Sequence, residues 1–74
     1  MTTSTANFEI VANISEGRNA EILQRVSAAI QAVPGVTLRD VHTDADHDRS
    51  VYTYVGEAEA LALATRALAR LAIA

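Results

Sequence analysis

The sequence predicts an α+β domain whose elements follow the order β-α-β-β-α, and three observations support that prediction. Residues 8–15 alternate apolar and polar side chains, as expected of a strand with one buried face. Residues 19–33 repeat apolar side chains at helical spacing. Residues 50–55, "SVYTYV", are mostly β-branched or aromatic, which favours a strand. A chain of 74 residues holds one small domain, which buries only about 60% of the surface that its unfolded form exposes.

The first strand and the first helix have the clearest patterns. The apolar face of the strand consists of Phe8, Ile10, Ala12 and Ile14. The buried stripe of the helix consists of Ile22, Leu23, Val26, Ala29, Ile30 and Val33. Asn19 is a favourable N-cap, and Glu21 places a negative charge in the first turn. Pro34 restricts Val33, and Gly35 can adopt a left-handed conformation, so the helix is predicted to end there.

The second half of the chain is predicted to form a hairpin and a second helix. Residues 36–42 and 50–55 form the two strands, joined by the seven-residue polar loop "TDADHDR". A loop longer than a tight hairpin turn is expected to carry a function or to be mobile. Residues 57–74 are rich in alanine and leucine, begin with acidic side chains and carry basic ones near the end, which suits a helix dipole. The buried stripe of this helix consists of Leu61, Ala64, Leu68 and Leu71.

This order of elements predicts a ferredoxin-like half-sandwich that lacks its final strand. In that fold the first strand is an inner strand, so its outer edge would stay unpaired here and would recruit a partner or aggregate. The last residues, "LARLAIA", have no glycine cap and no polar tail. We therefore expect a piece of something longer or half of an assembly. Residues 1–7 are polar without periodicity and are predicted to be a disordered N-terminus, which leaves residues 8–74 as the domain.

Composition narrows the classes of function. The formal net charge is −3, which argues against nucleic-acid binding, since phosphate contacts need a concentrated basic face. No stretch approaches the roughly 20 apolar residues of a membrane span. Cysteine is absent and the N-terminus does not resemble a secretion signal, so we expect a cytoplasmic protein without a thiolate metal site.

The stretch "NISEGRN", residues 13–19, lies between the first strand and the first helix. Backbone N–H groups at the start of a helix favour anions. Gly17 would let the backbone approach a ligand closely, and Arg18 can bind a carboxylate through two charge-assisted hydrogen bonds. The alternative is a simple turn in which Ser15 and Asn19 cap the helix and Arg18 points to water. These residues leave both interpretations open.

The loop "TDADHDRS", residues 43–50, contains three aspartates and is therefore considered first as a metal site. Asp44, Asp46 and Asp48 alternate like the first half of a calcium loop, but arginine stands where the pattern needs glycine, and valine where it needs glutamate. With one histidine and no thiolate, the loop is also poor for zinc. We therefore expect no metal.

A substrate cleft is the stronger interpretation of this loop. His47, Arg49 and Ser50 are predicted to face it, with the aspartates orienting His47 or Arg49 by hydrogen bonds. Histidine suits a reaction that moves protons near neutral pH. The alternative is a solvated acidic loop. Tyr52 and Tyr54 share one strand face and are predicted to pack against a second sheet or a partner rather than to stack nucleic-acid bases.

The stretches "VANISEGRN", "AVPGVTLRDV", "DADHDRSVYTYVG" and the alanine-rich helix after them together resemble the N-terminal subdomain of glutamate formimidoyltransferase, from Phe8 onward. Members of that family move a formimino group from N-formimino-glutamate to tetrahydrofolate, or a formyl group in a related reaction, during histidine breakdown. This chain has Ala12 where the family usually has proline, and His42 where it usually has aspartate. The family's catalytic histidine follows the second helix, beyond the last residue here.

The resemblance implies the N-terminal portion of a folate-dependent transferase, inactive alone, with tetrahydrofolate as the carrier and no catalytic residue in this chain. Whether His42 or His47 has a catalytic role stays open. The expected partners are these small molecules and either the remainder of the transferase or a second copy that pairs along the first strand. The alternative is a stand-alone, non-catalytic ligand-binding or dimerisation module of the same fold. The candidate substrate-binding residues are Asn13, Ser15, Glu16, Gly17, Arg18, Asn19, His42, His47, Arg49 and Ser50.

Overall fold

A computed structural model describes residues 7–73. Along this part of the chain lie β1 (Phe8–Ile14), α1 (Ala20–Gln31), β2 (Thr37–Asp44), β3 (Arg49–Gly56) and α2 (Ala58–Ile73). The predicted α+β class and the order β-α-β-β-α are confirmed. Of the predicted disordered N-terminus, residues 1–6 lie outside the described residues, as does Ala74.

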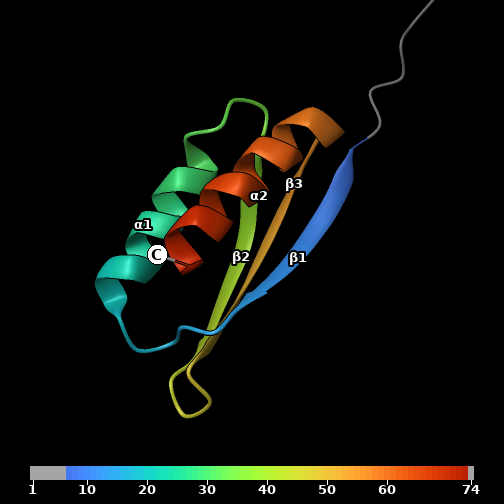
Figure 1. Cartoon of the computed structure of the whole chain (residues 1–74). Coiled ribbons are helices and arrows are strands. Elements are labelled where there is room, and N and C mark those ends of the chain that lie inside the picture. Colours follow the sequence, from blue (N-terminus) through green and yellow to red (C-terminus); the bar gives the residue numbers. More distant parts are fainter. Residues whose placement is uncertain (1–6, 74) are drawn as a thin grey trace, which may run out of the picture.

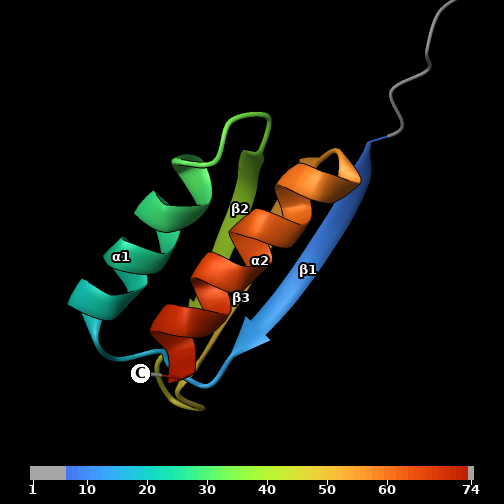
Figure 2. The same cartoon turned by 45° about the horizontal axis from the view of Figure 1, so that its top comes forward.

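The molecule has two layers, a three-stranded antiparallel sheet and a pair of helices that pack on one of its faces (Figure 1). The strand order is β1-β3-β2, and β1 pairs with β3 from Phe8 opposite Gly56 to Ile14 opposite Ser50. Figure 2 shows α1 and α2 side by side over the sheet. Within residues 7–73 the outer edge of β1 has no neighbouring strand, as expected of a ferredoxin-like half-sandwich without its last strand.

The core lies between the sheet and the two helices. Its buried apolar side chains are Ile14, Val26, Ile30, Tyr52, Tyr54, Leu61, Ala64 and Leu68. Partly buried side chains of the predicted stripes surround this core, namely Ile10, Ala12, Ile22, Leu23, Val33 and Leu71. The apolar faces that the sequence predicts for the first strand and both helices are therefore the faces that meet.

Tyr52 and Tyr54 lie beneath the helices of their own chain, so the prediction that they pack on a second sheet or a partner is wrong. The Tyr52 hydroxyl donates to the Leu23 carbonyl of α1 at 3.0 Å, and the Tyr54 hydroxyl is 2.7 Å from Thr65 Oγ1 of α2. Burial raises the pKa of Tyr52, and the Ser27 hydroxyl opposes part of that shift. The Tyr52 hydroxyl thus links β3 to α1, and the Tyr54 hydroxyl links β3 to α2.

Helix α1 begins as predicted and ends earlier. Asn19 Oδ1 accepts a hydrogen bond of 3.2 Å from the N–H three residues later, which confirms Asn19 as the N-cap. The helix ends at Gln31, two residues before Val33, because Pro34 disfavours helical backbone at the residue that precedes it. Gly35 has a positive φ of 87°, as the sequence predicted. Neither helix of the described residues is long and apolar enough to cross a membrane.

The connection between β2 and β3 is shorter than predicted. Asp44 pairs with Arg49, so residues 45–48 form a four-residue turn in place of the predicted seven-residue loop. The strands extend further because backbone pairing does not depend on the polarity of the side chains that follow. Asp48 has a positive φ of 51°, which aspartate tolerates better than most residues, and its N–H donates to Ala45 O at 3.3 Å.

Candidate functional site

The two sequence motifs meet at one end of the molecule. In Figure 1 the β1–α1 loop lies beside the turn between β2 and β3, at the bottom of the sheet. The Gly17 N–H donates to Asp48 Oδ1 at 2.8 Å, and Arg18 Nε donates to Ala45 O at 3.0 Å. The Ser50 hydroxyl donates to the Glu16 carbonyl. Three hydrogen bonds therefore join segments about 30 residues apart in the sequence.

Gly17 is the point of closest backbone approach between these two segments. A Cβ atom on Gly17 would lie 2.6 Å from Arg49 N and 2.6 Å from Asp44 O, closer than real Cβ atoms come to other atoms. The residue is buried. The close approach that the sequence suggested for a ligand is made here to the hairpin backbone, and the Gly17 N–H is held by Asp48.

An internal carboxylate occupies the start of α1. Glu16 Oε2 accepts hydrogen bonds from the N–H groups of Arg18 at 3.3 Å and Asn19 at 3.1 Å. Such N–H groups favour negative charge because they lie at the positive end of the helix dipole. The anion that the sequence predicted for this position is therefore supplied by Glu16, and a ligand carboxylate would need a different donor.

Arg18 is the residue of this loop whose side chain has donors left over. Its Nε is engaged by Ala45 O, and no other described residue accepts a hydrogen bond from its guanidinium. The side chain is exposed. The two terminal nitrogens are thus left to form the paired, charge-assisted contact that a guanidinium makes with a carboxylate.

The turn between β2 and β3 is organised by Asp44. Its Oδ1 accepts from the N–H groups of Asp46 at 3.0 Å and His47 at 3.2 Å, and its Oδ2 is 2.7 Å from His47 Nδ1. The side-chain hydrogen bond from His47 is the largest cause that lowers the pKa of Asp44. The His47 side chain is 76% exposed. The predicted orientation of His47 by an aspartate is confirmed, and it leaves Nε2 as the nitrogen open to a ligand.

The remaining candidate residues are divided between the two faces of the sheet. Asn13 and His42 both pair with Val51, and all three side chains lie on the face without helices. Asn13, His42 and Arg49 are exposed. Ser50 lies on the opposite face, fully buried, where its hydroxyl holds the Glu16 carbonyl and is 3.3 Å from Thr43 Oγ1. Ser15 is exposed just after β1.

The sequence predicted that Asp48, like the other aspartates of the loop, orients His47 or Arg49, whereas its carboxylate accepts the Gly17 N–H. The available signal was an aspartate next to the end of a hairpin turn, where a residue that tolerates positive φ is favoured. Within residues 7–73 no group of three or more His, Asp or Glu side chains is placed to share a metal ion.

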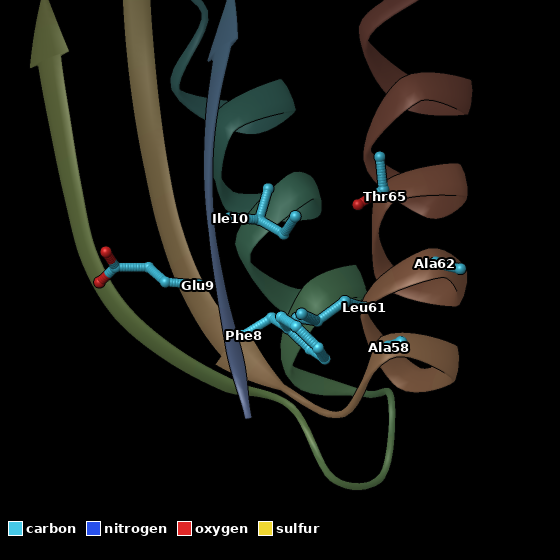
Figure 3. Close-up of a pocket in the computed structure, with 7 residues that line it drawn as sticks. All are labelled: Phe8, Glu9, Ile10, Ala58, Leu61, Ala62 and Thr65. Atoms are coloured by element: carbon cyan, nitrogen blue, oxygen red, sulfur yellow. The ribbon is translucent and has the colours of Figure 1, made fainter. Parts of the chain in front are cut away.

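An apolar groove lies at the other end of the sheet (Figure 3). It has a volume of about 590 Å³ and runs between the start of β1 and the first turns of α2. In Figure 3 Phe8 and Ile10 point toward α2, whereas Glu9 points to the other face of the sheet. The α2 residues that line the groove are Ala58, Leu61, Ala62 and Thr65. Phe8 is 52% exposed, so this end of the core is open.

The motifs joined at the turn end belong to a known family. The profile described as "Formiminotransferase domain, N-terminal subdomain" matches residues 7–74. The chain belongs to this family. The resemblance inferred from the motifs is confirmed, and the site described above is the part of a formiminotransferase N-terminal subdomain in which those motifs meet.

Individual relatives agree with this assignment. A glutamate formimidoyltransferase of Streptococcus pyogenes serotype M1 is 42% identical over 53 residues, which cover 72% of this chain and 18% of that protein. A formimidoyltransferase-cyclodeaminase of Gallus gallus is 44% identical over 64 residues, or 86% of this chain and 12% of that protein. A glutamate formimidoyltransferase of Thermoplasma acidophilum is 45% identical over 47 residues, or 64% and 16%. The chain therefore spans less than a fifth of the length of these curated relatives.

Proposed function

We propose that this chain is the N-terminal portion of a glutamate formimidoyltransferase that moves a formimino group from N-formimino-glutamate to tetrahydrofolate in the cytoplasm, during histidine degradation. The chain contributes substrate-binding residues and is inactive alone. The relatives named above are transferases of this kind by their names, and they are five to eight times longer than the matched segment. Groups outside this chain complete the reaction.

The observation that supports this proposal most is the hydrogen bonding of the Arg18 guanidinium. Its Nε is tied to Ala45 O, and among the described residues nothing accepts from its terminal nitrogens. Both substrates of the proposed reaction carry glutamyl carboxylates. A guanidinium held by one nitrogen and open at the other two suits a carboxylate, because two parallel N–H···O bonds fix its orientation as well as its position.

His47 and Arg49 extend this binding surface around the turn. Formimino transfer passes through a tetrahedral intermediate and needs proton movement at the reacting nitrogens. We assign no proton transfer to this chain. His47 offers Nε2 to a substrate, since Nδ1 is taken by Asp44. Asn13, His42 and Arg49 supply polar contacts on the open face of the sheet at the same end. Glu16, Asn19 and Ser50 hold the loop that presents Arg18, and the exposed Ser15 lies at the start of that loop.

Calorimetry of the purified chain with tetrahydrofolate tests the proposal. We expect a dissociation constant in the micromolar range, and binding about tenfold weaker for Arg18→Ala, since a hydrogen-bonded charge contributes roughly 1.5–3 kcal/mol. Arg66→Ala on the exposed face of α2 is the matched control and should bind as the unmodified chain does. Absence of heat would leave the chain a scaffold, and equal affinity for both arginine variants would remove Arg18 from the site.

A second proposal concerns the outer edge of β1. We propose that this edge pairs with a strand from the remainder of the transferase, whose apolar side chains enter the groove between β1 and α2. The unpaired N–H and C=O groups of an edge strand favour such an addition, and Phe8 and Ile10 offer apolar surface to the same partner. The alternative function, a stand-alone dimerisation module, uses the same edge to pair two copies.

Sedimentation of the isolated chain separates these two uses of the β1 edge. A concentration-dependent dimer that Phe8→Ser abolishes would favour the dimerisation module. A stable monomer counts against that module and leaves the edge for the rest of the enzyme. A matched control is Leu63→Ser on α2, which is also exposed but does not line the groove.

A further inference from the structure

We propose that Asp48 is a positioning residue for Arg18, which rests on the proposed function of Arg18 in carboxylate binding. Asp48 Oδ1 accepts the Gly17 N–H at 2.8 Å, one residue before Arg18. Both hydrogen-bonded groups are largely sheltered from water, since Gly17 is buried and Asp48 is half-buried. This bond therefore fixes the Glu16–Gly17 peptide unit, one residue before Arg18, against the hairpin.

The same turn also holds the side chain of Arg18. Ala45 O accepts from Arg18 Nε at 3.0 Å and from the Asp48 N–H at 3.3 Å. The backbone of Asp48 thus sets the direction of the carbonyl that orients the guanidinium, while its carboxylate holds the backbone one residue before Arg18. Two bonds from one four-residue turn restrain the arginine at both ends, which lowers the entropy lost when a carboxylate is bound.

The backbone conformation at position 48 restricts which residues can do this. A φ of 51° is left-handed, a region that glycine, asparagine and aspartate adopt with little strain. Glycine keeps the turn but has no acceptor for the Gly17 N–H. Asparagine keeps both the turn and a side-chain oxygen, though without the charge. The pair Asp48→Gly and Asp48→Asn therefore separates the turn shape from the hydrogen bond.

The test combines amide exchange with calorimetry on the full chain. NMR follows the hydrogen exchange of the Gly17 N–H and the Arg18 Nε–H, with the N–H groups of Ile30 and Tyr52 as reporters of the core. In Asp48→Gly we expect faster exchange at Gly17 and Arg18, an unchanged core, and tetrahydrofolate binding about tenfold weaker. Asp48→Asn should restore both protection and affinity. Asp48→Gly combined with Arg18→Ala should bind no more weakly than Arg18→Ala alone, because a positioning residue acts through the residue it positions.

Three results would overturn the role of Asp48. The first is Arg18 Nε–H exchange in Asp48→Gly that equals that of the unmodified chain. The second is unchanged tetrahydrofolate affinity in Asp48→Gly, which leaves the proposed function intact and removes this residue from it. The third is an additive loss in the double variant. An unmodified chain that binds no folate removes the proposed function itself, and the role of Asp48 falls with it.

Discussion

The two ends of the sheet differ in which contacts their side chains make. At the turn end, polar groups close on one another, with Gly17 on Asp48, Arg18 on Ala45 and His47 on Asp44. At the opposite end, Phe8 is 52% exposed beside an apolar groove of about 590 Å³. The same two-layer fold thus has one end whose loops are held together by hydrogen bonds and one end whose apolar side chains are partly uncovered.

This difference separates two kinds of recognition. A restrained arginine surrounded by satisfied hydrogen bonds suits a small charged ligand, because little order is lost on binding. An open apolar groove beside an edge strand suits another polypeptide segment, because main-chain pairing and side-chain burial can occur together. This difference is the reason that we propose substrate binding at the turn end and contact with the rest of the transferase at the groove end.

Adding one methyl group at Gly17, at the turn end, should destabilise the fold most. Gly17→Ala would place a carbon 2.6 Å from two hairpin backbone atoms, which cannot move away without breaking the β2–β3 pairing. We expect a loss of about 2 kcal/mol in the free energy of unfolding, measured by urea denaturation.

A larger side chain at the groove end should lower the free energy of unfolding less than Gly17→Ala does. Ala62 lines the groove and is exposed, so Ala62→Leu should change the free energy of unfolding by less than about 0.5 kcal/mol. If Gly17→Ala were as stable as the unmodified chain, or Ala62→Leu as damaging as Gly17→Ala, the contrast between the two ends would be wrong.

A smaller effect distinguishes the two tyrosines of β3. Tyr52→Phe removes a bond to α1, and Tyr54→Phe removes a contact with Thr65 at the groove. Each should lower the free energy of unfolding by about 1 kcal/mol. Thr65→Val should add little to Tyr54→Phe but its full effect to Tyr52→Phe. Full additivity with Tyr54→Phe would show that the phenol and the threonine are not coupled.

The smallest effect is a dependence on pH at the turn. The pKa of Asp44 is below its ordinary value of 3.8 in the folded chain, so the unfolded chain takes up this proton first as the pH falls. The stabilisation is complete above pH 3.8 and is lost as the pH falls further through the lower folded value. Asp44→Asn should flatten the pH dependence of unfolding in this range, whereas Asp46→Asn should leave that slope in place.

The layout of the fold was predictable from the sequence because local signals and core packing agree. Apolar periods in β1, α1 and α2 select the faces that meet, Asn19 caps a helix, and Gly35 takes the positive φ. The extent of the hairpin and the β-bulge between Leu38 and Asp40 were not predictable, because most residues at these positions are polar and the apolar pattern does not mark where the pairing ends or shifts.

The candidate site was predictable as a set of motifs and not as a set of contacts. Glycine and arginine in one loop indicated a close approach and a carboxylate ligand, but a sequence does not say which backbone a glycine approaches. The partner of Gly17 is Asp48, 31 positions away. Likewise, Ser50 looked available for a substrate until the fold placed it under Glu16. In both cases the role of the residue depends on a contact with a segment that is distant in the sequence.

Amide chemical shifts followed during titration with tetrahydrofolate would show whether the ligand binds at the turn end, as we propose, while the groove end is kept for contact with another polypeptide segment. Titration should shift the N–H signals of Gly17, Arg18, His47 and Arg49 in a saturable manner and leave those of Phe8, Ile10 and Leu61 unchanged. Saturable shifts centred on the groove, with a silent turn, would contradict this proposal.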